Sequence, residues 1–365
     1  MSKTIFHKQH LDNNAKMVDF AGWDMPINYP LGIIKESNIV RNSSGFFDVS
    51  HMGRVEIRGN GAESFIDKIL PININSLKIG SAKYTLLINE KKEILDDLII
   101  YRFADYFLLI INASNTDEDI SWMQSVKDKD VEINNITSET GMLAIQGPDV
   151  IKIFNSISNN AIKDLGRYKF KNILIENNDI FVARTGYTGE DGVEIIFKSE
   201  FAYKIWELLI NNDVTPCGLG ARDLLRIEAG LHLYGHEITK KSNPVDIGLK
   251  RLLESESSKY INNDYIHSEN IRKGLFSMIG LVVTDRGIPR EGNEIYYKDS
   301  VIGKVTSGTH SSTLKRSIAI GIVKKDFNII NNTVRIKVRD KFLNATITKL
   351  PFYKRSKKWV KYQIT

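Results

Sequence analysis

The chain has 365 residues, of which 42% are hydrophobic and 26% charged, a composition typical of folded globular proteins and unlike that of disordered ones. The single cysteine, Cys217, excludes a disulfide framework and a cysteine-rich zinc site. The longest apolar runs are far shorter than the ~20 residues of a membrane-spanning helix, so we expect no membrane association.

The 50 Lys and Arg residues exceed the 44 Asp and Glu residues by six, which is a mild excess. Because most basic residues are scattered, solvated surface charge is the favoured explanation, and we expect no nucleic-acid partner. Residues 1–16 are polar and poor in Arg, unlike a signal or transit peptide, and we therefore expect a cytoplasmic protein. The one dense basic cluster lies near the end of the chain, at Lys349, Lys354, Arg355, Lys357, Lys358 and Lys361.

Short helices and strands alternate in the first part of the chain. Residues 62–70 have helical spacing, with Phe65 and Ile69 on one face. Two β-rich runs follow, 94–103 and 106–112, and the two residues between them predict a hairpin.

Three further helices are expected before residue 230. The first covers 114–126, with Ser114 or Thr116 as its N-cap and three acidic residues in its first turn. The other two cover 201–209 and 221–230.

The pattern changes near residue 276, where short strands and turns replace the alternation. The polar segment 253–273 is the expected junction, so the sequence predicts an α+β body over residues 1–270 and an all-β domain, barrel or sandwich, over 271–365. The expected strands are 278–283, 294–297, 301–305, 317–323, 333–338 and 343–350.

The pair Asp96-Asp97 interrupts a strand that is otherwise apolar. Because neighbouring residues of a strand point to opposite faces, one of these two carboxylates faces inward or into a cleft. A buried carboxylate costs several kcal/mol unless donors reach it, which favours a functional role for one member of the pair. An edge strand with two solvated acids is the alternative.

Other features carry weaker signals. The glycine-rich loop 185–194 contains Tyr187 and Glu194, which suit an aromatic ring and an amidine-like N–H pair, but a long hairpin turn has the same composition. His232 and His236 have the spacing of a helical metal pair, but no third ligand is in register, and we expect no metal. The phosphate-binding, dinucleotide and nucleophile-elbow motifs are absent from the sequence.

Taken in order, these segments resemble the aminomethyltransferase, or T-protein, family of the glycine cleavage system. The resemblance spans residues 5–355 without large gaps. It rests on residues 17–23 (MVDFAGW), 47–53 (FDVSHMG), 95–99 (LDDLI), 143–148 (LAIQGP), 186–192 (GYTGEDG), 216–223 (PCGLGARD), 226–231 (RIEAGL), 233–235 (LYG), 285–290 (DRGIPR), 306–309 (TSGT) and 349–352 (KLPF).

The resemblance implies a three-lobed, cloverleaf-like fold with a central tetrahydrofolate cavity. Its first two lobes would be interleaved in sequence, and its third would be the C-terminal β domain. The implied reaction moves the aminomethyl-derived carbon from the lipoyl arm of the H-protein to tetrahydrofolate, which acts as co-substrate. The products would be 5,10-methylenetetrahydrofolate and ammonia.

The resemblance also implies roles for individual residues. The family's key acid matches Asp96, which would assist proton transfer, and Glu194 would bind the pterin N–H groups. The expected folate-binding residues, together with Glu194, are Arg222, Tyr187, Tyr84, Asn112 and Tyr234. Lys354 and Arg355 would neutralise the folate glutamate, dock an acidic H-protein or simply carry surface charge.

The sequence departs from the family pattern in places, and two alternatives stay open. Lys92 and Glu93 replace two glycines before the acid pair, and His310 and Ser312 replace Phe and Pro. One alternative is a tetrahydrofolate-dependent demethylase of a small methylated substrate. The other is a non-enzymatic folate-binding iron–sulfur or tRNA-modification factor, which the absence of a Cys at 233–237 disfavours.

Overall fold

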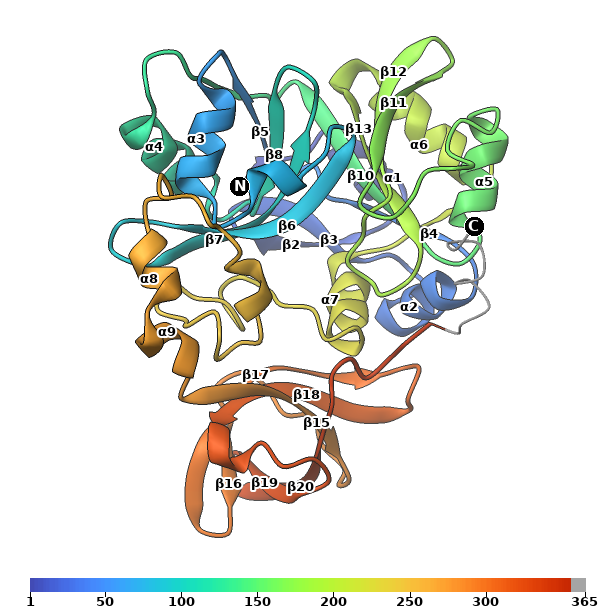
Figure 1. Cartoon of the computed structure of the whole chain (residues 1–365). Helices are drawn as coiled ribbons and strands as arrows, with labels where there is room; N and C mark the ends of the chain where they lie inside the picture. Colours follow the sequence, from blue (N-terminus) through green and yellow to red (C-terminus); the bar gives the residue numbers. More distant parts are fainter. Residues whose placement is uncertain (356–365) are drawn as a thin grey trace.

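The computed structural model describes residues 1–355 and consists of three lobes. Two lobes, each a β-sheet covered by helices, stand side by side, and a β-barrel lies below both of them (Figure 1). Among the described residues no helix is both long and apolar enough to cross a membrane.

The first lobe is a five-stranded sheet with two helices on one face. Apolar residues of both helices pack against the strands and bury most of that face. The strand order is β6 (Ser81–Ile88), β7 (Ile94–Arg102), β8 (Phe107–Ile111), β5 (Gly53–Arg58) and β9 (Glu132–Asn135), and the helices are α3 (Ala62–Ile69) and α4 (Thr116–Val126).

The second lobe is a six-stranded sheet whose strands come from both sides of the first lobe in the chain. Strand β4 precedes the first lobe and β10 follows it, yet the two pair antiparallel, with Leu143 opposite Asp48. This pairing interleaves the two lobes. The order is β11 (Phe170–Ile175), β12 (Asn178–Ala183), β13 (Gly192–Lys198), β10 (Thr140–Gln146), β4 (Gly45–Asp48) and β14 (Thr215–Pro216).

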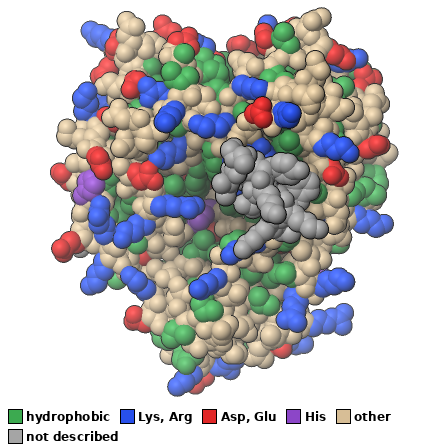
Figure 2. Space-filling view, turned by 45° about the vertical axis from the view of Figure 1, so that its right-hand side comes forward, with side chains coloured by type: hydrophobic (Ala, Val, Ile, Leu, Met, Phe, Trp, Pro, Cys, Tyr) green, Lys and Arg blue, Asp and Glu red, His purple; other side chains and the backbone are tan. Residues whose placement is uncertain are grey.

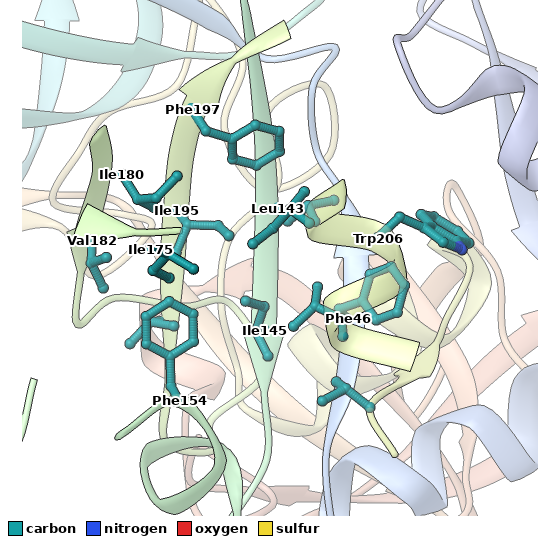
Figure 3. Packing of buried hydrophobic residues seen from close by; sticks show 14 of the residues in the cluster. Phe46, Leu143, Ile145, Phe154, Ile175, Ile180, Val182, Ile195, Phe197 and Trp206 are labelled. Carbon is teal, nitrogen blue, oxygen red and sulfur yellow. The ribbon is translucent and has the colours of Figure 1, made fainter. Parts of the chain in front are cut away.

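The core of the second lobe is rich in aromatic and branched side chains (Figure 3). Trp206 packs edge-on against Phe46, with ring centroids 4.8 Å apart. Leu143 is fully buried between these rings and the strands. The covering helices are α1 (His7–Asp12), α5 (Val150–Ile157) and α6 (Ala202–Ile210).

Smaller elements surround these two sheets. A short N-terminal sheet has the order β1 (Ser2–Lys3), β3 (Trp23–Asn28) and β2 (Lys16–Phe20). Two short helices, α8 (Asn263–His267) and α9 (Glu269–Lys273), precede the barrel. The remaining helices, α2 (Ile33–Asn42) and α7 (Leu219–Glu228), contact each other, and α7 also contacts β3 and two barrel strands.

The C-terminal lobe is a closed six-stranded barrel, because β15 pairs with both β18 and β20. Closure leaves no open sheet edge. All six expected strands are confirmed, although β17 continues six residues beyond the expected end at 305. The order is β15 (Phe276–Val283), β18 (Arg316–Lys324), β17 (Ser300–Ser311), β16 (Glu294–Tyr297), β19 (Thr333–Val338) and β20 (Lys341–Thr348).

Buried charges on α7 connect this helix to α2 and to the barrel. Arg226 donates to Glu237 at 2.8 Å and to Ser307 of the barrel at 2.7 Å. Glu228 accepts from Arg41 of α2 at 2.7 Å and from Ser311 of the barrel at 2.5 Å. Each of these buried charges therefore has several polar partners, as a charge removed from water requires.

The expected helices and the hairpin of β7 and β8 are confirmed, and one expected detail is wrong. The residue that precedes α4 is Asn115, rather than Ser114 or Thr116, and its side chain does not cap the helix. Asn115 instead donates its amide to Leu95 O and Asp96 Oδ1, because a buried carboxylate competes for this donor.

The second-lobe core offers a matched stability test. Leu143 is fully buried in β10, whereas Leu174 in β11 is 63% exposed. We expect Leu143→Ala to lower the free energy of unfolding by about 2–5 kcal/mol, because it leaves a cavity, and Leu174→Ala to change it by less than about 0.5 kcal/mol. Urea denaturation monitored by circular dichroism measures both values. Equal decreases in the free energy of unfolding would contradict this description of the core.

Candidate active site between the lobes

The two aspartates of β7 lie on opposite faces of the first-lobe sheet. Asp96 is opposite Leu87 of β6, and Leu87 belongs to the core beneath α3 and α4. Asp97 is opposite Leu86 and shares its face with Tyr84, on the side away from those helices. The sheet therefore separates one carboxyl in the core from one outside it.

Asp96 is completely buried and surrounded by amide donors. Its Oδ2 accepts from the Asn112 backbone N–H at 2.8 Å, and its Oδ1 accepts from the side-chain amides of Asn112 and Asn115, each at 2.7 Å. Burial raises the pKa of Asp96, although these donors oppose the rise by stabilising the carboxylate.

Asp97 is partly exposed and has fewer donors. The Tyr84 hydroxyl donates to its Oδ2 at 2.8 Å, and the Asn112 amide reaches its Oδ1 at 3.1 Å. Burial and the nearby Asp96 raise the pKa of Asp97 to about 7. This carboxyl can therefore accept and release a proton near neutral pH, which general acid–base chemistry requires.

A second acid faces the site from β13. Glu194 is 4% exposed, and its Oε2 accepts from the Thr185 hydroxyl at 2.5 Å. Arg222 of α7 lies close enough for its charge to interact with that of Glu194. A carboxylate held in this way can accept hydrogen bonds from a ligand that carries adjacent N–H groups.

Tyr187 and Arg222 stack on one another. The guanidinium carbon lies 4.7 Å from the centre of the tyrosine ring, and the Tyr187 hydroxyl donates to the backbone carbonyl of His232. The Arg222 Nη1 is buried and has no hydrogen-bond partner within residues 1–355. Such an unsatisfied cationic donor is costly, so this atom is suited to a polar ligand group.

Six of the seven residues expected from the sequence lie in this region, and the seventh, Asp96, lies behind it. Tyr84 interacts electrostatically with Asp97 and Tyr187, and the hydroxyl of Tyr234 donates to Ile94 O at 2.9 Å beside the acid pair. Asp96 is connected through Asn112, from behind the sheet. The space-filling view shows a hollow between the lobes, with hydrophobic side chains inside it and Lys and Arg side chains at its border (Figure 2).

Two residues of this region, Asp97 and His51, are not among the site residues expected from the sequence, although Asp97 belongs to the acid pair. His51 is buried, and burial lowers its pKa to about 4, so its imidazole is neutral near Arg222 and Asp48. No residue in the described part of the chain bonds its Nδ1. The alternation of β7, combined with the position of Tyr84 on β6, is the signal that distinguishes Asp97 from Asp96.

The side chains of the two histidines with metal-like spacing contact a backbone carbonyl and a carboxylate. His232 bonds the carbonyl of Ile247 at 2.7 Å, and His236 lies 3.1 Å from Glu291. Within residues 1–355, no group of three His, Cys, Asp or Glu side chains could hold a metal ion.

In the tail, Lys354 is exposed and Arg355 lies 3.4 Å from Asp191. The other lysines of the basic cluster near the chain end, Lys357, Lys358 and Lys361, lie outside the described residues.

Comparison with known proteins identifies close relatives over nearly the whole chain. Family models described as the GCVT N-terminal domain and the glycine cleavage T-protein C-terminal barrel domain match residues 6–257 and 277–354. Curated aminomethyltransferases of Bacillus mycoides (strain KBAB4) and Bacillus cytotoxicus are 39% and 40% identical, each covering 98% of this chain and 99% of the relative.

A solved structure is similar as well. The crystal structure of the glycine cleavage system aminomethyltransferase T from Bartonella henselae is 31% identical and superimposes with a TM-score of 0.91, covering 97% of this chain and 98% of that chain. The expected three-lobed α+β fold with a C-terminal barrel is confirmed.

The raised pKa of Asp97 predicts a pH-dependent stability. Between its ordinary value of 3.8 and about 7, the folded state keeps a proton on Asp97 that the unfolded state has released. The free energy of unfolding therefore falls as the pH rises through this interval. Asp97→Asn removes this loss, so its melting temperature relative to wild type should rise from about pH 4 to about pH 7 and then level off. Calorimetry measures both melting temperatures, and a difference between them that does not change with pH would contradict the raised pKa of Asp97.

Proposed function

The chain belongs to the glycine cleavage T-protein family of aminomethyltransferases, and from this premise we propose how its residues perform the reaction. The protein transfers the aminomethyl-derived carbon to tetrahydrofolate, the co-substrate of this family. The relatives named above are all aminomethyltransferases, which favours this function over a demethylase or an iron–sulfur or tRNA-modification factor.

Tetrahydrofolate is proposed to bind between the lobes, in contact with Glu194, Tyr187 and Arg222. The Glu194 carboxylate would accept hydrogen bonds from the amino and ring N–H groups of the pterin. Tyr187 would pack along the folate, and Tyr84, Asn112 and Tyr234 would form the adjacent wall. The buried Arg222 Nη1, which has no partner in the described chain, supports this proposal because a polar group of the folate would satisfy it.

We assign the proton-transfer role to Asp97, although the sequence resemblance assigned it to Asp96. The single observation behind this choice is the alternation of β7. Asp96 is enclosed in the core beneath the helices, whereas Asp97 is partly exposed and bonded to Tyr84. Asp96, which touches no open space, would position Asn112.

Proton balance explains why an acid with a pKa near neutrality suits this reaction. The methylene carbon loses its bonds to the amino nitrogen and to the lipoyl sulfur, and gains bonds to two folate nitrogens. Two N–H protons leave the folate, one ending on ammonia and the other on the thiol. Asp97, with a pKa of about 7, can accept such a proton and return it.

Two further proposals accompany this function. The donor would be the lipoyl arm of an H-protein, because membership in the glycine cleavage system implies a protein-borne aminomethyl group. We also propose residues 1–270 and 271–365 as the two structural units. That the protein works in the cytoplasm stays a prediction from its sequence.

A comparison of two asparagine variants tests the assignment of the acid. Asp97→Asn should lower the turnover of aminomethyl-loaded, lipoylated H-protein by about 10²–10⁴-fold, the range for a positioned acid–base group, with little change in tetrahydrofolate affinity. Asp96→Asn should lower turnover less. The measurement is the rate of 5,10-methylenetetrahydrofolate formation. If Asp96→Asn lowered turnover more than Asp97→Asn, the proton-transfer role would belong to Asp96.

A matched pair of variants on and beside β13 tests the pterin contact. Glu194→Gln should weaken tetrahydrofolate binding by about 10–100-fold, because it replaces one acceptor oxygen by an NH2 donor and removes the charge that strengthens the hydrogen bonds from the pterin. Glu200→Gln, at an exposed position six residues further on, is the control and should bind normally. Isothermal titration calorimetry measures both affinities, and equal affinities would exclude Glu194 from the binding site.

A further inference from the structure

A third aspartate, which has no role in the proposed reaction, is buried behind the acid pair. Asp119 lies in the first turn of α4 and has no exposed surface. Helix α4 contacts β7 and β9. The Asp119 backbone N–H donates to Asn115 O at 2.8 Å, and the Asn115 amide donates to Asp96 Oδ1 at 2.7 Å, so Asp119 is joined to Asp96 through one residue and the two buried carboxyls lie near each other.

The two carboxyls differ sharply in their donors. Asp96 accepts three hydrogen bonds from Asn112 and Asn115. Neither oxygen of Asp119 accepts a hydrogen bond from any amide, hydroxyl or charged donor within residues 1–355. Two buried carboxylates in contact repel one another, and a buried carboxylate without donors is unstable. The arrangement is satisfied when Asp119 keeps its proton and donates it in a hydrogen bond to Asp96.

We propose that Asp119 is a positioning residue, whose neutral carboxyl donates a hydrogen bond to Asp96 and so keeps the negative charge of this pair on Asp96, directly behind Asp97. The proposal rests on the proposed function only in its last step, where Asp97 is the acid of the reaction. Burial and the charge of Asp96 raise the pKa of Asp119 to about 10, in agreement with a proton held at neutral pH.

Asn112 connects this pair to the site. Its side-chain amide donates to Asp96 Oδ1 at 2.7 Å and to Asp97 Oδ1 at 3.1 Å, so a shift of Asp96 moves a donor of Asp97. The negative charge on Asp96 is also one of the causes that raise the pKa of Asp97. If Asp96 became neutral, the pKa of Asp97 would fall.

Other charged groups face Asp119 and enter the test. Glu118 on the same helix raises its pKa, as Asp97 does from β7. Tyr234 and Lys240, from the segment after α7, also interact with Asp119. Lys240 forms a surface ion pair with Glu118 at 2.5 Å, so these two largely compensate each other. These groups are unchanged in the variants below.

Thermal stability tests whether Asp119 is protonated in the folded state, and this test does not depend on the reaction. If Asp119 is neutral in the fold, the unfolded state loses this proton near pH 4 and the folded state keeps it, so the wild type loses stability as the pH rises. The melting temperature of Asp119→Asn relative to wild type should therefore increase steadily from about pH 5 to about pH 9. Asp117→Asn, an exposed change in the same turn, should give a constant difference.

Kinetics test the coupling to Asp97. Asp119→Asn keeps a donor toward Asp96 and should turn over within about threefold of wild type. Asp119→Leu removes the donor, which raises the pKa of Asp96 further and favours its neutral form. We expect about a tenfold or greater loss in kcat, an unchanged KM for tetrahydrofolate and an acidic limb of the kcat profile that moves to lower pH.

The outcomes distinguish a failure of the proposal for Asp119 from a failure of the proposed function. A constant melting-temperature difference for Asp119→Asn would overturn the proposal, whatever the kinetics. Equal kinetic losses in the Asn and Leu variants, or an unmoved acidic limb in the Leu variant, would overturn the positioning role. If the Leu variant does not fold, near-normal turnover of Asp119→Asn together with its pH-dependent stability gain supports the proposal. If the wild type lacks turnover, the proposed function fails and the stability test still decides the state of Asp119.

Discussion

The buried ion pairs of α7 hold this helix against α2 and against the barrel. Arg226 is bonded to Glu237 and to the barrel, and Glu228 is bonded to Arg41 and to the barrel. Burial alone raises the pKa of Glu237, but Arg226 and the hydroxyls around it outweigh burial and lower the pKa. Loss of one partner would leave an uncompensated buried charge, at a cost of about 3–5 kcal/mol.

The same helix carries Arg222 into the site, so the contacts between lobes and the contacts to a ligand share one rigid element. Helix α7 begins at a close approach to β3, where the Gly218 N–H donates to Glu36 and a Cβ at position 218 would lie 2.4 Å from backbone atoms of Ile27. This position therefore accepts only glycine. A shift of α7 would move Arg222 away from Tyr187 and Glu194, which come from the second lobe.

Locally encoded features were predictable from the sequence, and features that depend on tertiary contacts were not. The spacing of apolar residues located α3 and α6, and turn residues located the barrel strands. The acid pair attracted attention for a sound reason, since a carboxyl in an apolar strand requires donors. Which acid faces the site depends on the face that α3 and α4 cover, and the sequence does not specify that face. Asp119 is hidden for the same reason, because it resembles any acid in the first turn of a helix.

The turn between β6 and β7 shows how the chain tolerates a departure from its family pattern. Lys92 adopts a φ of +66°, a conformation that favours glycine. Asn89 compensates, because its side-chain oxygen accepts hydrogen bonds from the backbone N–H groups of Lys91 and Glu93. These bonds stabilise the turn that precedes the acid pair.

The proposed role of Asp97 requires that a folate bound between the lobes meets Asp97 and not Asp96. A crystal structure of the protein with tetrahydrofolate tests it most directly. We expect the pterin N–H edge within hydrogen-bond distance of Glu194, a folate polar group on Arg222 and the N5/N10 edge turned toward Asp97. A folate bound elsewhere, or with its N5/N10 edge turned away from Asp97, would contradict the account.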